Sequence, residues 1–153
     1  MDLYDVYPKE YIHRSLDMLS KMGKEFGIGY NNKNGKFNTR LAHLGGFYAL
    51  ENGKYDEYAR AVFKAYFEDG LNLYNREVLS EIAENIGLNP AKMLDAIDSK
   101  KYDENLKEAR NLAIEYGIQS VPTFIINNKY KISGIRDYED FKKAIVDIFN
   151  RLD

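Results

Sequence analysis

Residues 117–126, GIQSVPTFII, lead from a helical pattern into a short run of β-branched and aromatic residues. Gly117 is suited to cap the preceding helix, and Pro122 stands directly before the apolar run 123–126. A proline at the head of a strand is tolerated because it removes no hydrogen bond from the interior of the ladder. From this local pattern alone the segment is a helix-to-strand connector, since only about 5% of X-Pro bonds are cis.

A β-hairpin and a final helix are predicted after this connector. Residues 123–126 and 129–133 are β-prone runs joined through Asn127 and Asn128, which tolerate the positive φ of a tight turn. Asp137 can cap a last helix. A lone two-stranded hairpin is marginal in water, so a third strand or a covering helix is needed. Residues 3–7 are the other candidate strand, and a second copy of the chain or a different polypeptide could also complete the sheet.

Helical periodicity dominates the sequence upstream. Apolar residues recur at three- and four-residue spacing in residues 8–27, 38–51, 55–70, 75–87, 90–97 and 106–117. Residues suited to begin or end these helices are Pro8, Gly27, Asn38, Asn52-Gly53, Gly70, Asn75, Gly87 and Asn89-Pro90. The clearest stripe, which we expect to be buried, is Tyr55, Tyr58, Ala59, Val62, Phe63, Tyr66 and Phe67. Gly45-Gly46 favours a close approach of two helices. The sequence therefore predicts a mainly α protein with a small β-hairpin.

The composition is that of one ordinary folded domain. A chain of 153 residues with 44% apolar and 30% charged residues can build its own core. Lys and Arg number 22 against 24 Asp and Glu, and the net charge of −2 disfavours a nucleic-acid-binding surface. Neither a membrane span nor a signal peptide is predicted, so we expect a cytoplasmic protein.

Cysteine is absent, and this absence limits the possible chemistry more than any other count. It removes disulfides, thiolate nucleophiles, cysteine-ligated zinc and iron–sulfur clusters. His13 and His43 lack the i, i+4 partner of a helical zinc site, so we expect no metal. No G-x-S-x-G elbow or Ser-His-Asp spacing is present, so no catalytic residue is assigned. Any redox role must use the sulfur of another molecule.

Three motifs, taken in order, resemble one family. Residues 117–145 resemble the C-terminal end of the DsbA-like thioredoxin-fold proteins, in particular their cytoplasmic FrnE-type branch. In these proteins a helix leads through Gly-x-x-x-Val-Pro-Thr-Phe into a hairpin and a final helix. Asn38-Thr39-x-x-Ala42-His43 is similar to the start of the family's inserted helical domain, and residues 65–88 are similar to its middle. The resemblance spans about residues 8–150 and extends to 2-hydroxychromene-2-carboxylate isomerases and kappa-class glutathione transferases.

The resemblance implies a truncated DsbA-like thioredoxin fold, α/β in class, with a helical insertion domain. Residues 1–153 would form a single domain, with a helical insertion region at 8–116 and a C-terminal thioredoxin half at 117–153. The family pattern implies a cis bond before the loop proline. It also implies an edge that binds an extended peptide or glutathione, formed by Ser120, Val121, Pro122 and Thr123. Asn38 and His43 are secondary candidates, and His43 is expected to pack between insertion and core.

The sequence departs from the family at the N-terminal side. The family carries a Cys-x-x-Cys on a βαβ unit, at a helix N-terminus that lowers the pKa of the thiolate. The helix after Pro8 lies where the family's chain has already left that unit. The resemblance therefore implies that the catalytic half-unit is missing, together with the strand that the two-stranded sheet lacks.

Two functional hypotheses follow. In the first, a DsbA-family protein without its own redox chemistry binds a peptide or partner through residues 120–123, forms a homodimer and has no cofactor, glutathione being a candidate ligand. In the second, the chain is one part of a split or truncated disulfide oxidoreductase or glutathione-dependent isomerase that needs a separate βαβ subunit. A lost upstream sequence is a third alternative. The sequence names no substrate.

Overall fold

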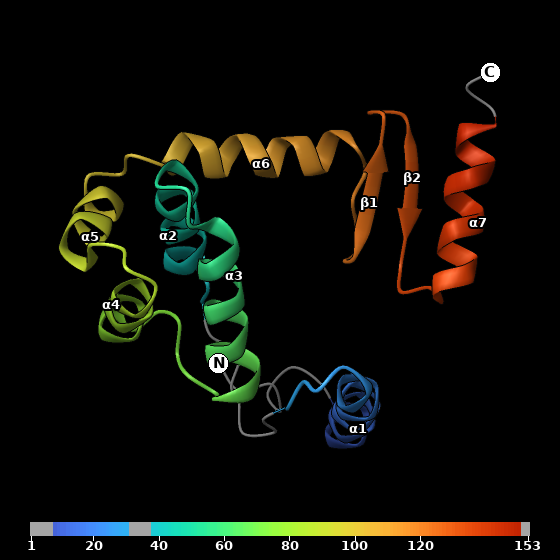
Figure 1. Cartoon of the computed structure of the whole chain (residues 1–153), viewed down its shortest axis with the longest axis horizontal. Coiled ribbons are helices and arrows are strands. Elements are labelled where there is room, and N and C mark those ends of the chain that lie inside the picture. The colour runs from blue at the N-terminus through green and yellow to red at the C-terminus, as the bar shows by residue number, and fades with distance from the viewer. Residues whose placement is uncertain (1–7, 31–37, 151–153) are drawn as a thin grey trace. The chain divides into compact units, whose positions relative to one another are not determined.

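The computed structural model of the chain describes residues 8–30 and 38–150 (Figure 1). These residues form seven α-helices: α1 Lys9–Glu25, α2 Arg40–Glu51, α3 Tyr55–Phe63, α4 Arg76–Asn85, α5 Pro90–Asp98, α6 Asp103–Glu115 and α7 Tyr138–Phe149. A π-helical turn, η2 Lys64–Glu68, continues α3, and the strands are β1 Thr123–Ile126 and β2 Tyr130–Ser133. The prediction of a mainly helical chain with one small hairpin is confirmed. The candidate strand at residues 3–7 lies outside the described residues.

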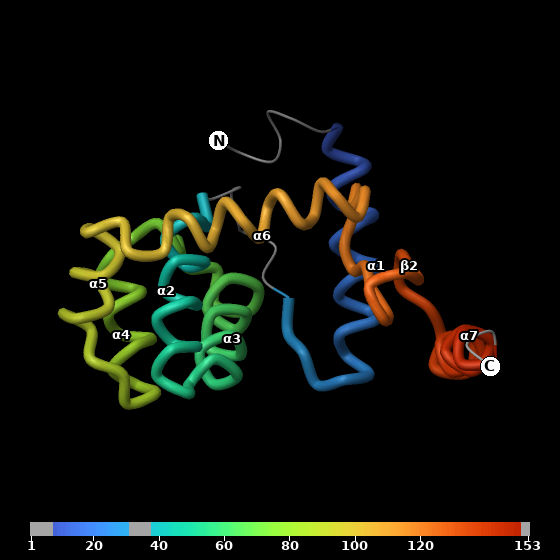
Figure 2. Tube along the Cα trace, turned by 90° about the horizontal axis from the view of Figure 1, so that it is seen from above, coloured from blue at the N-terminus to red at the C-terminus, as the bar shows by residue number. Residues whose placement is uncertain are grey.

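The chain consists of two compact units, one ending at Lys107 and the other beginning at Glu108. This boundary falls within α6, whereas the sequence analysis divides the chain at the end of the same helix. The core of the first unit lies between α2, α3, α4 and α5, which are neighbours in Figure 2. Leu79 of α4 and Met93 of α5 are its largest completely buried side chains. Most of the buried hydrophobic side chains among the described residues belong to this helical core.

Gly45 explains how closely α2 and α3 approach. A Cβ at this position would collide with the hydroxyl of Tyr58 and would lie 3.3 Å from the sulfur of Met93. At Gly46 the same atom would make only ordinary contacts, at 3.7 Å and beyond. Close helix approach therefore depends on the first glycine of the pair.

Asparagine side chains begin two helices as predicted. Asn75 accepts a hydrogen bond from the N–H of Glu77 at 2.9 Å, and Asn89 accepts one from the N–H of Lys92 at 3.0 Å. The prediction that Asn38 is the N-cap of the second helix is wrong by one residue. That helix begins at Arg40 with Thr39 as the N-cap, although the Asn38 side chain still accepts the Arg40 N–H at 2.9 Å.

The expected burial of the Tyr/Phe stripe on α3 and η2 is wrong for two of its members. Tyr58 is 2% exposed, but Tyr55 is 49% and Phe63 is 62% exposed. Phe63 follows Tyr58 by five residues, which places it roughly 140° around the helix from the buried face. The predicted stripe therefore contains more residues than one face of the helix can bury.

The π-helical turn η2 has a local cause in the spacing of Lys64 and Asp69. The N–H of Asp69 donates to the carbonyl of Lys64 at 3.0 Å, which is the i→i+5 bond of a π-helix. The Lys64 ammonium also donates to Asp69 Oδ1 at 2.8 Å and to Oδ2 at 3.0 Å. Main-chain and side-chain bonds between the same two residues therefore close this wider turn.

The second unit contains the hairpin and α7. Strand β1 pairs antiparallel with β2 in the register Thr123↔Ser133, Phe124↔Ile132, Ile125↔Lys131 and Ile126↔Tyr130. Asn127 and Asn128 both have positive φ, as the sequence predicted for the turn. The ring of Phe124 packs edge-on against Phe141 of α7, with centroids 4.8 Å apart. Among the described residues of this unit, only Ile132 and Ile148 are buried hydrophobic side chains, so its core is thin.

Candidate functional site

The loop between α6 and β1 is held first by the way α6 ends. Gly117 has a φ of 58°, a left-handed conformation that glycine adopts without steric cost. Its N–H donates to the carbonyl of Ile114 at 2.9 Å, and the N–H of Ile118 donates to the carbonyl of Ala113 at 2.8 Å. This pair of bonds is a Schellman motif, and it turns the chain out of the helix toward Pro122.

Two side chains of the hairpin bind carbonyl groups of the same loop. The ammonium of Lys131 on β2 donates to the carbonyls of Tyr116 at 3.3 Å and Gly117 at 3.1 Å. The hydroxyl of Thr123 on β1 donates to the carbonyl of Ser120 at 2.7 Å and lies 3.3 Å from the hydroxyl of Ser133. The loop is therefore fastened to the hairpin at both of its ends.

The peptide bond between Val121 and Pro122 is cis. The carbonyl of Pro122 accepts the N–H of Gly134 at 2.9 Å, which extends the pairing of the hairpin by one step beyond Thr123. Because proline has no N–H, Pro122 makes only this one backbone bond across the hairpin, to the residue that follows β2.

The direction of the backbone groups along β1 follows from this bond. In an antiparallel pair, alternate residues direct both N–H and C=O toward the partner strand. Because Pro122 faces Gly134, the residues facing β2 are Pro122, Phe124 and Ile126, and those facing away are Thr123, Ile125 and, by continuation, Val121. Within the described residues β1 pairs with β2 alone, and the side chain of Val121 is 88% exposed.

The two faces of the hairpin differ in polarity. Side chains directly opposite each other lie on the same face, so Thr123, Ser133 and Lys131 share one face with Ile125. Phe124, Ile126, Tyr130 and Ile132 share the other face, which carries the contact with Phe141. The open edge of β1 is therefore flanked by hydroxyl groups on one side and by apolar side chains on the other.

The structure brings together four of the six site residues suggested by the sequence. Ser120, Val121, Pro122 and Thr123 form the loop and the start of β1. Asn38 and His43 lie in the first unit, where both side chains are exposed. Asn38 binds the Arg40 N–H, as described above. His43 is exposed on α2 between buried Ala42 and buried Leu44, and its packing between the insertion and the core stays a prediction.

Lys131 and Ser133 are residues of this site that the sequence analysis did not identify. Both lie on β2, and their approach to the loop depends on the hairpin register. The available signal was the alternation along β2, which places them on the same face as Thr123. Nothing in the local sequence shows that a lysine side chain reaches back to a helix end.

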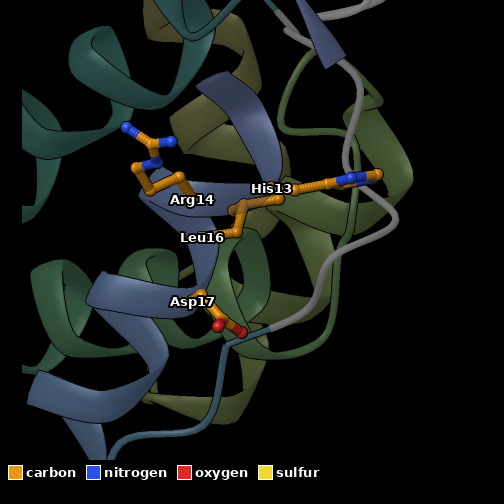
Figure 3. Close-up of a pocket in the computed structure, with 4 residues that line it drawn as sticks. All are labelled: His13, Arg14, Leu16 and Asp17. Atoms are coloured by element: carbon orange, nitrogen blue, oxygen red, sulfur yellow. The ribbon is translucent and has the colours of Figure 1, made fainter. Parts of the chain in front are cut away.

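A hollow on α1 is a weaker candidate. It is lined by His13, Arg14, Leu16 and Asp17, all from one helix (Figure 3). In the close-up the side chains of His13 and Arg14 extend away from each other, so they do not converge on a point where a ligand could react. Within residues 8–30 and 38–150, no group of three or more His, Cys, Asp or Glu side chains is placed to hold a metal ion. None of the helices described is both long and apolar enough to cross a membrane.

Helix, proline loop, antiparallel hairpin and final helix place the protein in the class of thioredoxin-like folds. Residues 6–146 match the family described as the DSBA-like thioredoxin domain, and the chain belongs to this family. YwbO of Bacillus subtilis is 34% identical over 131 residues, which are 85% of this chain and 64% of that protein. The thiol:disulfide interchange protein DsbA of Azotobacter vinelandii is 32% identical over 71 residues, 46% of this chain and 33% of that protein.

Solved structures show the same fold. A probable DsbA oxidoreductase from Streptomyces coelicolor superposes with a TM-score of 0.85 at 21% identity, covering 96% of this chain and 64% of that one. A 2-hydroxychromene-2-carboxylate isomerase superposes with a TM-score of 0.72 at 20% identity, covering 98% and 73%. The chain thus spans less than two thirds of the length of YwbO and of the Streptomyces protein. It contains no cysteine.

Proposed function

We propose that residues 120–125 bind an extended polypeptide segment, which adds a strand to the outer edge of β1. The observation that carries this proposal is the row of outward backbone groups at Val121, Thr123 and Ile125, beginning at a side chain that is 88% exposed. Strand addition takes its affinity from such groups and its specificity from alternate side chains. Reduced glutathione, a short extended peptide, is the small-molecule candidate for the same edge.

The site supports binding, and it contains no group for thiol chemistry. Exchange between thiols and disulfides needs an attacking thiolate, and residues 1–153 contain no cysteine. A disulfide oxidoreductase or isomerase activity would therefore need sulfur from another polypeptide or from glutathione. The chain by itself acts as a peptide- or partner-binding module of the DsbA family.

The two faces of the hairpin define the segment that fits. A strand added beside β1 alternates its side chains between the face of Phe124 and Ile126 and the face of Thr123 and Ile125. Phe124 is still 42% exposed despite its contact with α7. An extended segment with an apolar residue at every second position would cover this ring, so we expect such segments to bind better than uniformly polar ones.

The proposal is tested by following backbone amide signals in nuclear magnetic resonance spectra. The probes are reduced glutathione and the capped peptide Val-Thr-Val-Thr-Val, each titrated to millimolar concentration. The amide signals of Thr123 and Ile125 should shift and gain protection, whereas those of Phe124 and Ile126 already face β2 and should change less. Unchanged signals along β1 at millimolar probe would refute the proposal. A dimer in light scattering, with protected β1 amides before any probe is added, would identify a second copy as the strand donor.

A complementing subunit is the second candidate for the role of the chain. The unit beginning at Glu108 has only two buried hydrophobic side chains among its described residues. Its exposed large apolar side chains are Leu112, Ile114, Val121, Phe124, Ile135, Tyr138, Val146 and Phe149. A separate βαβ polypeptide carrying a Cys-x-x-Cys would cover part of this surface and supply the thiolate. Co-expression should then give a one-to-one complex that reduces insulin disulfides, and a βαβ polypeptide that never co-purifies would exclude this role.

A further inference from the structure

Lys131 belongs to the hairpin, but its side chain binds the end of α6. It occupies the middle of β2, opposite Ile125, and its side chain reaches two carbonyl oxygens at the end of α6. The Schellman motif at Gly117 already satisfies the carbonyls of Ala113 and Ile114. The two carbonyls that Lys131 binds, those of Tyr116 and Gly117, lie just beyond this motif, where a helix end has no backbone donors left.

The contact is favourable because of its charge. The C-terminal end of a helix carries partial negative charge, so a lysine ammonium is stabilised there. Hydrogen bonds from an ammonium to carbonyl groups are stronger than those between neutral groups. Lys131 therefore fixes the end of α6 against β2, three residues before the start of the proposed binding edge at Ser120.

We propose that Lys131 is a positioning residue for the binding edge, and that it does not itself contact the ligand. Together with Thr123 it holds the loop from Gly117 to Pro122 in the shape that presents the outward groups of Val121 and Thr123. A loop that is already ordered binds with less loss of conformational entropy, so losing the clamp should lower affinity without removing any ligand contact. This inference rests on the proposed function of the edge, but the clamp itself is measurable without ligand.

Three variants separate the clamp from general stability. K131M keeps the length of the side chain without its charge, K131R keeps the charge, and K129M removes a lysine whose ammonium lies over the Tyr130 ring and not at the loop. The first readout is amide hydrogen exchange in the free protein. In K131M, exchange of the Gly117 and Ile118 amides, which donate to Ile114 and Ala113, should accelerate by roughly tenfold, with the hairpin amides of Phe124 and Ile132 unchanged. K131R should restore slow exchange, and K129M should behave as the native chain.

The second readout is the dissociation constant for the capped Val-Thr-Val-Thr-Val peptide. K131M should bind it roughly three- to tenfold more weakly, while K131R and K129M stay within twofold of the native protein. Native exchange of the Gly117 and Ile118 amides in K131M would overturn the proposal, and so would acceleration spread evenly over the hairpin. If the native protein binds no peptide, the proposed function fails while the exchange data still decide the role of Lys131. If K131M does not fold, K131Q serves the same comparison.

Discussion

The hydroxyl of Tyr58 on α3 donates a hydrogen bond to the carbonyl oxygen of Ala42 on α2, 3.1 Å away and inside the helical core. Burial raises the pKa of the Tyr58 phenol, because the ionised form would lose its hydration in the core. This bond links the two helices whose close approach depends on Gly45.

Replacing Tyr58 by phenylalanine should destabilise the protein by about 1 kcal/mol, because a buried hydrogen bond is lost without loss of ring packing. Urea unfolding monitored by circular dichroism measures the effect. The matched control is Y55F on the same helix, where the side chain is 49% exposed and the change should stay within about 0.5 kcal/mol. Equal effects of the two substitutions would contradict the assignment of Tyr58 as a buried donor.

Alanine substitutions at Gly45 and Gly46 of α2 should change the free energy of unfolding in opposite directions. G45A puts a methyl group where the Tyr58 hydroxyl lies, and the overpacking should cost about 1–3 kcal/mol. G46A meets only ordinary contacts, at 3.7 and 3.8 Å, and should gain up to about 1 kcal/mol from the higher helix propensity of alanine. The free energies of unfolding of the two variants should therefore lie on opposite sides of the native value. A stabilised G45A would show that α2 and α3 can separate freely.

Local rules predicted the features that depend on neighbours in sequence. The caps at Asn75 and Asn89 need only a side-chain oxygen and an N–H two or three residues later, so the sequence contains the whole interaction. The turn at Asn127 and Asn128 is local in the same sense. The family resemblance located the loop at Pro122 from the order of motifs, which no single local rule provides.

Nonlocal packing, together with one unusual local spacing, accounts for what the sequence did not predict. Periodicity alone did not show that Phe63 falls outside the buried face, because the centre of that face is set by the contact of Tyr58 with α2. The π-helical turn is a local feature that joins Lys64 to Asp69, and the three- and four-residue spacing used to predict helices does not detect it. Lys131 reaches the end of α6 only after the hairpin has formed. The contacts of Tyr58 with α2 and of Lys131 with α6 both join segments that are separated in sequence and meet only in the folded chain.

The carboxylate of Glu51 should make stability depend on pH. It accepts hydrogen bonds from the Lys101 ammonium at 2.6 Å and from the Tyr102 hydroxyl, and these bonds lower the pKa of Glu51, Lys101 having the larger effect. A carboxyl whose pKa is lower in the folded state stabilises the protein above its unfolded pKa of about 4.3. That contribution is lost as the pH falls through the folded-state value.

E51Q should therefore be less stable than the native protein at pH 7, and the difference should shrink as the pH is lowered below about 4. Thermal unfolding from pH 7 to pH 3 measures it, with E81Q on the exposed face of α4 as the control. A gap between native and E51Q that stays constant over this range would contradict the assigned ion pair and hydrogen bond.

The hydroxyl of Thr123 provides the most direct mutational test of the proposed binding edge. T123V keeps the shape of the side chain and removes the donor to the Ser120 carbonyl at 2.7 Å. Because that carbonyl can bind water instead, the loss of stability should be below about 1 kcal/mol, but the loop loses one of its two side-chain fastenings. Affinity for the capped Val-Thr-Val-Thr-Val peptide, measured by calorimetry, should fall several-fold. S133A removes a hydroxyl on the same face that lies 3.3 Å from Thr123, and it should weaken binding less. If T123V binds as tightly as S133A, the Ser120 carbonyl does not set the shape of the edge.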